Sequence, residues 1–235
     1  MIQQIDCLEG LQNLEDNSVN CIVTSPPYNK KGLLKSSSKG NQIWGKFSID
    51  YNSYGDDMPE TEYQEWMVKV LNECHRVLAE DGSFFFNHKP RRYKNRCRLP
   101  TEFISQSDAQ LYQLVIWDRR NSPNIRNDVL VPCTEHIYWF CKKKPKVFRD
   151  AVDAPYRGEV WVIPPGKQKL HPAPFPETLV RNCILLTTEP GDLVLDPFAG
   201  SGTTLAVARE LGRDFLGFDI DDLYVKMSQD RVGVR

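Results

Sequence analysis

The sequence predicts an α/β protein built on a mostly parallel, doubly wound sheet. Short apolar segments alternate with stretches of helical periodicity, and one apolar strand runs through a glycine-rich turn into a helix. Chains of this class cover both faces of the sheet with helices and bind ligands at the carboxyl ends of the strands. We expect strands at residues 20–24, 83–87, 111–117, 136–141, 193–195 and 215–218.

The longest predicted helix lies between the first two strands. Thr61 and Gln64 have the spacing of a capping box, and apolar side chains follow at helical intervals through residues 63–78. Asp81-Gly82 is expected to end this helix. Residues 30–58 are rich in Gly, Ser, Lys and Tyr and are expected to form a long loop.

The first strand leads into Ser25-Pro26-Pro27-Tyr28, with Asn29 next. Each proline fixes its own φ and pushes the preceding residue toward extended geometry, so the carbonyls of the turn are aimed in advance. Ser25 Oγ and a carbonyl of the Ser-Pro step suit the hydrogens of a planar exocyclic amine, and Tyr28 offers a flat face to a nucleic-acid base. The same residues also suit an ordinary strand exit with a buried tyrosine.

A second turn joins the strand at 193–195 to a helix at 205–211, and reads Asp196-Pro197-Phe198-Ala199-Gly200-Ser201-Gly202-Thr203. The two glycines allow positive φ and close approach of a ligand to the backbone, while the helix start presents unpaired N–H groups. The next strand ends in Asp219, at the usual place for a carboxylate that accepts the hydroxyls of a ribose.

The details of this turn select among ribose ligands. Leu205 stands where a dinucleotide fingerprint has its third glycine, and no Gly-Lys-Ser/Thr is present for a triphosphate. Asp196 would repel a pyrophosphate but attract the cationic amino-acid end of S-adenosylmethionine. The methyl donor therefore fits best, although Asp196 and Asp219 could each simply cap local structure.

Together the two motifs resemble those of DNA amino-methyltransferases that modify adenine N6 or cytosine N4. The catalytic motif precedes the cofactor motif, as in the circularly permuted β group of that family. The resemblance implies a Rossmann-like methyltransferase fold, S-adenosylmethionine as cofactor, a flipped base in double-stranded DNA as substrate, and a restriction-modification role. It implies catalytic roles for Ser25, Pro26, Pro27 and Tyr28, and cofactor-binding roles for Asp6, Asp196, Phe198, Gly200, Ser201, Gly202, Thr203 and Asp219.

Further segments match the family. Residues 5–11 resemble the loop whose acid, here Asp6, contacts the adenine of the cofactor, although Asp6 and Glu9 also have the spacing of a helix cap. Residues 161–165 and 171–177 resemble the segments that lead into the helix before the cofactor strand. We expect one domain over 1–235, with a catalytic half at 1–144, a short target-recognition segment at 145–170 and a cofactor-binding half at 171–235.

The net charge of −1 conceals an uneven distribution of cations. A DNA backbone bound by basic loops releases counterions, which predicts a steep dependence of affinity on salt. An ordinary solvated loop is the alternative for residues 89–98. The residues expected to contact DNA are Lys30, Lys31, Lys89, Arg91, Arg92, Lys94, Arg96 and Arg98.

Composition favours a cytoplasmic enzyme. No apolar run is long enough to span a membrane, and seven cysteines without paired spacing favour reduced thiols. Cysteine and histidine spacing gives no zinc-type cluster, so no metal is expected. A homodimer is possible, because the segment at 145–170 is short for target recognition.

The target amine is the least determined feature. Within the resemblance, Ser25 slightly favours cytosine N4 over adenine N6. An RNA or protein-amide methyltransferase is an alternative, although those families carry Asn at this position and the unpermuted order. An inactive nucleic-acid-binding protein is a second alternative. Pro132-Cys133 resembles the nucleophile pair of carbon-5 methyltransferases but lies in the wrong order relative to the glycine turn.

Overall fold

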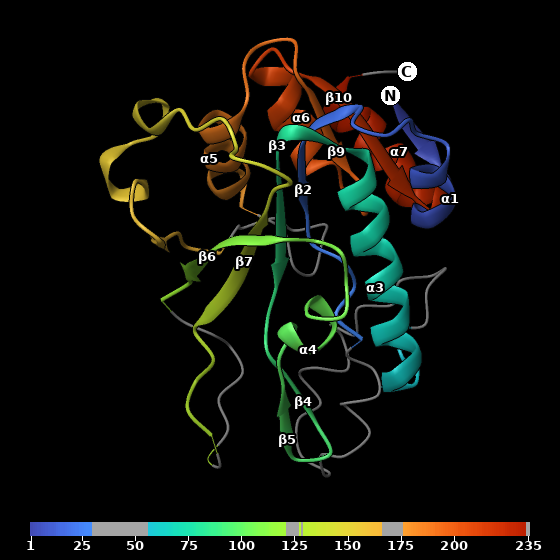
Figure 1. Ribbon diagram of the computed structural model, residues 1–235, viewed down its shortest axis with the longest axis vertical. Helices are drawn as coiled ribbons and strands as arrows, with labels where there is room; N and C mark the ends of the chain where they lie inside the picture. The colour runs from blue at the N-terminus through green and yellow to red at the C-terminus, as the bar shows by residue number, and fades with distance from the viewer. Residues whose placement is uncertain (30–55, 121–126, 128, 166–175, 234–235) are drawn as a thin grey trace.

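The computed structural model describes residues 1–29, 56–120, 127, 129–165 and 176–233. These residues form an eight-stranded sheet with the strand order β1-β10-β9-β2-β3-β7-β6-β8 (Figure 1). Its strands are β1 (Ile2–Gln4), β2 (Val19–Thr24), β3 (Leu78–His88), β6 (Leu111–Asp118), β7 (Thr134–Phe140), β8 (Val160–Val162), β9 (Leu193–Asp196) and β10 (Asp214–Asp219). Only β7 runs antiparallel to its neighbours β3 and β6, so the predicted mostly parallel sheet is confirmed.

Helices cover both faces of this sheet, as a doubly wound fold requires. Along β3, Phe84 and Phe86 point to one face, whereas Phe85 points to the other. The first face packs against α1 (Cys7–Gln12) and α3 (Glu60–Val77), and the second against α5 (Glu177–Thr187) and α6 (Thr203–Glu210). The other α-helices of the described residues are the short α4 (Thr101–Ile104) and α7 (Asp222–Val232), which packs against α6.

Both predicted boundaries of α3 are wrong. The helix begins after Pro59 with no side-chain cap, so Thr61 lies within its first turn. At its other end, Leu78 takes an extended conformation directly after the helix and starts β3, which places Asp81-Gly82 inside the strand. A Cβ on Gly82 would lie 2.8 Å from the Asn20 carbonyl oxygen, so glycine permits close approach to the neighbouring chain rather than ending a helix.

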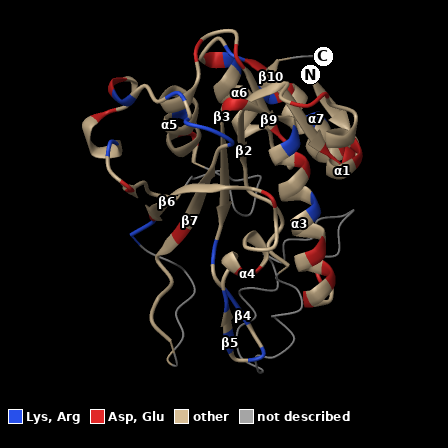
Figure 2. Ribbon diagram, in the orientation of Figure 1, with Lys and Arg blue, Asp and Glu red and all other residues tan. Residues whose placement is uncertain are grey.

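The basic segment after β3 is a hairpin rather than a loop. It consists of β4 (Arg91–Tyr93) and β5 (Arg96–Arg98), joined by Lys94 and Asn95 at φ values of 48° and 61°. Two consecutive positive φ angles are the signature of a type I′ turn, whose twist matches that of paired strands. Figure 2 shows that this hairpin extends beyond the end of β3 and that it carries several Lys and Arg residues.

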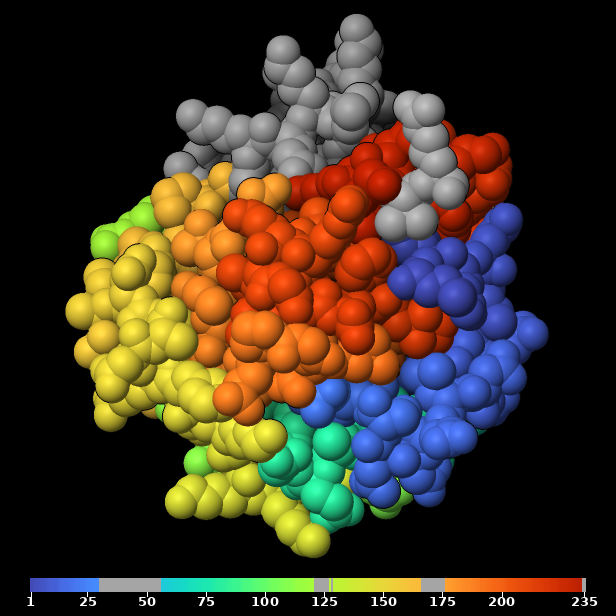
Figure 3. Space-filling view, turned by 90° about the horizontal axis from the view of Figure 1, so that it is seen from above, coloured from blue at the N-terminus to red at the C-terminus, as the bar shows by residue number. Residues whose placement is uncertain are grey.

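The two ends of the described chain meet in the fold. β1 pairs in parallel with β10, and the space-filling view shows N-terminal residues beside the C-terminal segment (Figure 3). The short strands β1 and β8 were not predicted from the sequence. β8 belongs to the segment expected to recognise the target, and its Trp161 is fully buried in the core. Among the described residues, no helix is both long and apolar enough to cross a membrane.

Candidate active site

The two predicted corners of the site meet at adjacent strands. β2 pairs with β9, so the Ser-Pro-Pro-Tyr turn and the glycine turn leave the same edge of the sheet. At that point Thr24 Oγ1 donates a hydrogen bond of 2.6 Å to Asp196 Oδ1. The expected convergence of these distant segments is therefore confirmed, and a side-chain hydrogen bond joins them directly.

Asp196 is a buried carboxylate held by donors from both corners. Its Oδ1 also accepts the Phe198 backbone N–H at 3.0 Å. Burial raises the pKa of Asp196 to about 6, although the hydrogen bonds from Thr24 and Phe198 act in the opposite direction. Burial therefore disfavours the ionised form of Asp196, and a positive charge nearby would offset this unfavourable free energy.

The glycine turn is tied to the end of β10. Gly200 and Gly202 have φ values of 49° and 76°, and the Gly200 N–H donates to Asp219 Oδ2 at 2.9 Å. A Cβ on Gly202 would overlap Ser228 of α7, so this position requires glycine for its conformation and for space. Asp219 thus orders the turn, and burial raises the pKa of its carboxyl group.

Asp6 caps helix α1 at the carboxyl end of β1. Its Oδ1 accepts the Leu8 N–H at 2.9 Å and the Glu9 N–H at 3.4 Å, which confirms the capping pattern. The Ile5 N–H donates to the Asp219 carbonyl oxygen at 3.0 Å, so the start of this helix lies beside the end of β10. Contact between Asp6 and an adenine ring stays a prediction.

These carboxylates suit a cationic ligand. Asp6, Asp196 and Asp219 lie at the ends of β1, β9 and β10, and within the described residues none of them forms an ion pair with Lys or Arg. Phe198 adds an apolar wall, packed edge-on against Trp66 at a ring distance of 5.7 Å. This set of acidic side chains therefore fits S-adenosylmethionine, which carries positive charge on its sulfonium and amino groups.

Of the remaining predicted cofactor residues, Thr203 begins α6 and Ser201 lies in the glycine turn before it. Thr203 Oγ1 accepts a hydrogen bond of 2.8 Å from Arg231, whose guanidinium also forms an ion pair with Glu177 at 2.6 Å. Arg231 lies near Ser201 as well, with its Nη1 at 3.4 Å from the Ser201 carbonyl oxygen. α5, α7 and the glycine turn are thus joined by one arginine that sequence reasoning missed.

The Tyr28 side chain is buried, and its hydroxyl group lies in a polar network. The hydroxyl oxygen is 2.9 Å from Ser25 Oγ, 2.8 Å from Asn87 Nδ2 and 3.1 Å from Glu135 Oε2. Its ring packs against His88 with centroids 4.5 Å apart, and the residue as a whole is 8% exposed. The side chain is therefore fixed through its hydroxyl group, whereas stacking on a base stays a prediction.

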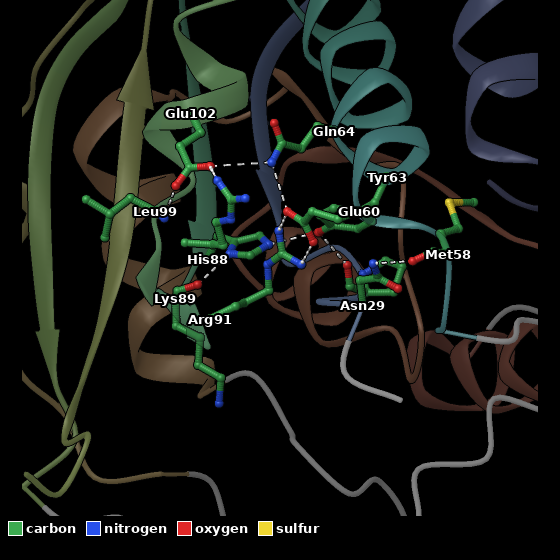
Figure 4. Close-up of polar contacts among 12 residues, drawn as sticks. Asn29, Met58, Glu60, Tyr63, Gln64, His88, Lys89, Arg91, Leu99 and Glu102 are labelled. Atoms are coloured by element: carbon green, nitrogen blue, oxygen red, sulfur yellow. Dashed lines mark hydrogen bonds and ion pairs between the residues drawn. The ribbon is translucent and has the colours of Figure 1, made fainter. Parts of the chain in front are cut away.

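Helix α3 contacts the proline turn through the side chain of Tyr63 (Figure 4). Tyr63 Oη donates to the Pro27 carbonyl oxygen at 2.9 Å and lies 2.9 Å from His88 Nε2. His88 Nδ1 in turn lies 2.8 Å from the Lys89 carbonyl oxygen. The Pro27 carbonyl oxygen therefore already accepts a hydrogen bond within the protein.

The structure divides the predicted DNA contacts. The expectation that Arg91 contacts DNA is corrected, because this residue is buried. It is 5% exposed, forms two hydrogen bonds of 2.9 and 2.7 Å to Glu60, and lies over the Tyr63 ring. Arg98 is half-buried and pairs with Glu102 at 2.9 Å. Both therefore bind neighbouring carboxylates, which fix the hairpin to α3 and α4. Figure 4 shows Arg91 beside Glu60.

The other predicted contacts differ in exposure. Burial lowers the pKa of Lys89, whose Nζ lies 5.8 Å from the centre of the Tyr28 ring. The exposed cations of the hairpin are Arg92, Lys94 and Arg96. Lys30 and Lys31 lie outside the described residues, as do most of the loop at 30–58 and residues 171–175.

Glu135 on β7 is the most informative residue that the sequence reasoning missed. It is 6% exposed and binds Tyr28, Asn87 and, through an ion pair of 2.8 Å, Arg119. An acid at the edge of a predicted apolar strand was the available signal, but its partners are distant in sequence. In the described part of the chain, no three His, Cys, Asp or Glu side chains gather to hold a metal ion. The absence of a metal cofactor stays a prediction.

Comparison with known proteins agrees with this geometry. A family model described as DNA methylase, for N6 and N4 enzymes, matches residues 19–230. The Type II methyltransferase M.HpaI of Haemophilus parainfluenzae is 30% identical over 99% of this chain and 74% of its own length. M1.MboII of Moraxella bovis is 28% identical over 97% of this chain and 94% of its own length. The chain spans 66% of M.BglII of Bacillus subtilis, with 29% identity.

Solved structures share the fold. The cytosine-N4-specific PvuII DNA methyltransferase superposes with a TM-score of 0.78 at 23% identity, covering 98% of this chain and 85% of its own. The M1.HpyAVI complex with S-adenosylmethionine has a TM-score of 0.65 at 23% identity and covers both chains fully. With a family model matching most of its length and both motifs at adjacent strand ends, this chain belongs to the N6/N4 DNA methylase family.

Proposed function

We propose that this chain transfers a methyl group from S-adenosylmethionine to the exocyclic amine of a base flipped out of double-stranded DNA. Cytosine N4 is slightly favoured over adenine N6. The observation that carries the proposal is the hydrogen bond between Thr24 and Asp196, which joins the amine-binding corner to the cofactor corner. Relatives named as Type II methyltransferases support a restriction-modification role.

The residues of the site have separable tasks. Asp196 and Asp219 hold the glycine turn and favour a cationic cofactor, which would supply an electrophilic methyl group. Ser25 Oγ and a carbonyl of the Ser-Pro step accept the two amine hydrogens. These acceptors draw the nitrogen toward tetrahedral geometry, which makes its lone pair available. Tyr28 supports the base, which must leave the stack to reach this pocket.

A direct assay tests the reaction. Purified protein, S-adenosylmethionine and genomic DNA lacking amine methylation are incubated, and the hydrolysed nucleosides are identified by mass. N4-methyl-2′-deoxycytidine or N6-methyl-2′-deoxyadenosine is expected, and Ser25→Ala should remove either product. Methylation confined to RNA or protein, or to a ring carbon of cytosine, would contradict the proposal.

We assign the main phosphate contacts of the described chain to the tip of the β4–β5 hairpin. Arg92, Lys94 and Arg96 are exposed there, on a hairpin that follows the carboxyl end of β3 and is fixed by the buried pair of Arg91 and Glu60. Protein cations that neutralise phosphates make log affinity fall with log salt by about 0.9 per contact. Replacing all three with alanine should therefore reduce that slope by up to about 2.7.

A matched variant controls for net charge. Lys143, Lys144 and Lys226 are exposed. Lys143 pairs with Glu80 near the opposite end of β3. Their triple alanine variant changes the charge equally and should keep the parental salt slope. Equal slopes for the two triple variants would show that the hairpin does not contact the backbone. A homodimer and a cytoplasmic location stay predictions.

A further inference from the structure

We propose that Glu135 accepts, through the hydroxyl groups of Ser25 and Tyr28, the proton that the target amine releases on methylation. This inference rests on the proposed function. It starts from a buried carboxylate whose Oε2 is 3.1 Å from Tyr28 Oη, which is itself 2.9 Å from Ser25 Oγ. A continuous hydrogen-bonded chain therefore runs from the amine-binding serine into the interior.

The direction of this chain follows from the capacity of each group. Tyr28 Oη has one hydrogen and two lone pairs. Asn87 Nδ2 is a donor at 2.8 Å and takes one lone pair. The Tyr28 hydrogen has two acceptors within reach, Glu135 Oε2 at 3.1 Å and the Asn87 carbonyl oxygen at 3.4 Å, and we assign it to the nearer carboxylate oxygen. Ser25 must then donate to the second lone pair of Tyr28. Its own lone pairs are left to face an incoming amine.

Glu135 has room at Oε2 for the Tyr28 hydrogen. Arg119 Nη1 donates to Oε1 at 2.8 Å, and Asn87 Nδ2 donates to Oε2 at 2.9 Å. Each carboxylate oxygen has two lone pairs, so one on Oε2 is left for Tyr28. The methylated amine is a strong acid before it loses a proton, because only proton loss returns its lone pair to the conjugated ring. A carboxylate is therefore a sufficient acceptor.

Methyl transfer is accompanied by the passage of three protons along this chain. The nitrogen lone pair forms the new bond to the methyl carbon, and the electrons of the broken sulfur–carbon bond stay on sulfur. One amine proton passes to Ser25 Oγ while the serine proton passes to Tyr28 and the tyrosine proton to Glu135. The proton on the Ser25 side leaves, because a hydroxyl group can pass a proton onward and a carbonyl cannot. Glu135 ends as a neutral carboxylic acid.

Two variants interrupt the chain at different points. Tyr28→Phe keeps the ring and removes the hydroxyl group, and Glu135→Gln keeps the shape and removes the acceptor. The control is Tyr138→Phe, which also removes a buried phenol hydroxyl. Tyr138 lies on the same strand as Glu135, but its hydroxyl lies 3.2 Å from His136 Nδ1 and has no contact with Ser25.

The measurement is the single-turnover methylation rate in H2O and in D2O, with saturating DNA and S-adenosylmethionine. Wild type should show a solvent isotope effect. Tyr28→Phe and Glu135→Gln should lose about 100-fold or more in rate, together with that isotope effect, because general acid–base catalysis is worth this much. Cofactor affinity and capture of a 2-aminopurine target, read by fluorescence, should match wild type. Tyr138→Phe should behave as wild type throughout.

The outcomes separate this inference from the proposed function. If wild type methylates DNA but both variants keep its rate, the relay is wrong and the methyltransferase assignment stands. If the variants are slow yet keep the wild-type isotope effect, Glu135 only holds the ring, which also overturns the relay. If wild type methylates no amine in DNA, both proposals fail. Should Glu135→Gln not fold, Tyr28→Phe decides, because it leaves the ion pair with Arg119 intact.

Discussion

Asp196 should make the stability of the protein fall as the pH rises. Burial raises its pKa from 3.8 to about 6. The folded protein therefore binds this proton more tightly than the unfolded chain does. The resulting contribution to stability is fully present below about pH 4 and is lost as the pH rises through about 6. A shift of about two pKa units corresponds to about 3 kcal/mol in total.

The variant Asp196→Asn isolates this contribution. An asparagine Oδ1 can still accept from Thr24 and from the Phe198 N–H, but the side chain cannot ionise. Subtracting its unfolding free energy from that of wild type removes the shared contribution of Asp219, whose pKa is also raised by burial. Relative to Asp196→Asn, the unfolding free energy of wild type should fall by about 1.5 kcal/mol between about pH 5 and about pH 7.5.

Urea unfolding at several pH values measures this difference. The affinity for S-adenosylmethionine, measured by isothermal titration calorimetry, is an independent test. A cation beside the ionised carboxylate offsets the unfavourable free energy of burying its charge. Cofactor affinity of wild type should rise about tenfold over the same pH interval, whereas Asp196→Asn should show a smaller rise, to which Asp219 alone contributes. A stability difference that does not change with pH would refute the argument that burial of Asp196 is costly when it is charged.

Three further substitutions test the contacts that build the site. Thr24→Val should destabilise the fold by about 1–3 kcal/mol in urea unfolding, because Asp196 loses a buried donor; no effect would mean that the bond does not join the two corners. Glu60→Gln should cost about 3–5 kcal/mol, since Arg91 stays buried without its counter-charge; a near-wild-type value would show that Arg91 turns outward. Tyr28→Ala should weaken capture of a 2-aminopurine target by about 1–3 kcal/mol, and unchanged fluorescence titration would exclude stacking.

The order of the strands along the chain was accessible from sequence because it depends on local patterns. Each predicted strand is a short apolar run, and all six are found with ends shifted by a few residues. The helix boundaries of α3 were not accessible in the same way. In the sequence, Gly82 has the appearance of a residue that ends a helix. In the structure it permits close packing against Asn20 of a neighbouring strand.

In the basic segment, the sequence likewise does not show which arginines are buried and which are exposed. Arg91 and Arg96 are indistinguishable in a string of cations, yet one is buried against Glu60 and the other is exposed. Burial of an arginine depends on whether a carboxylate distant in the chain lies opposite, because an unpaired charge is too costly to remove from water. Only the packed structure supplies that partner.

The sequence by itself determined the chemistry at each corner, since a proline turn after a strand and a glycine turn before a helix are local signals. The tertiary structure decided how the corners meet. Thr24 and Asp196 become neighbours because β2 and β9 pair, and Ser25 gains a route to Glu135 because Tyr28 crosses toward β7. Such contacts join residues far apart in the chain, and only the order and register of the strands in the sheet fix them.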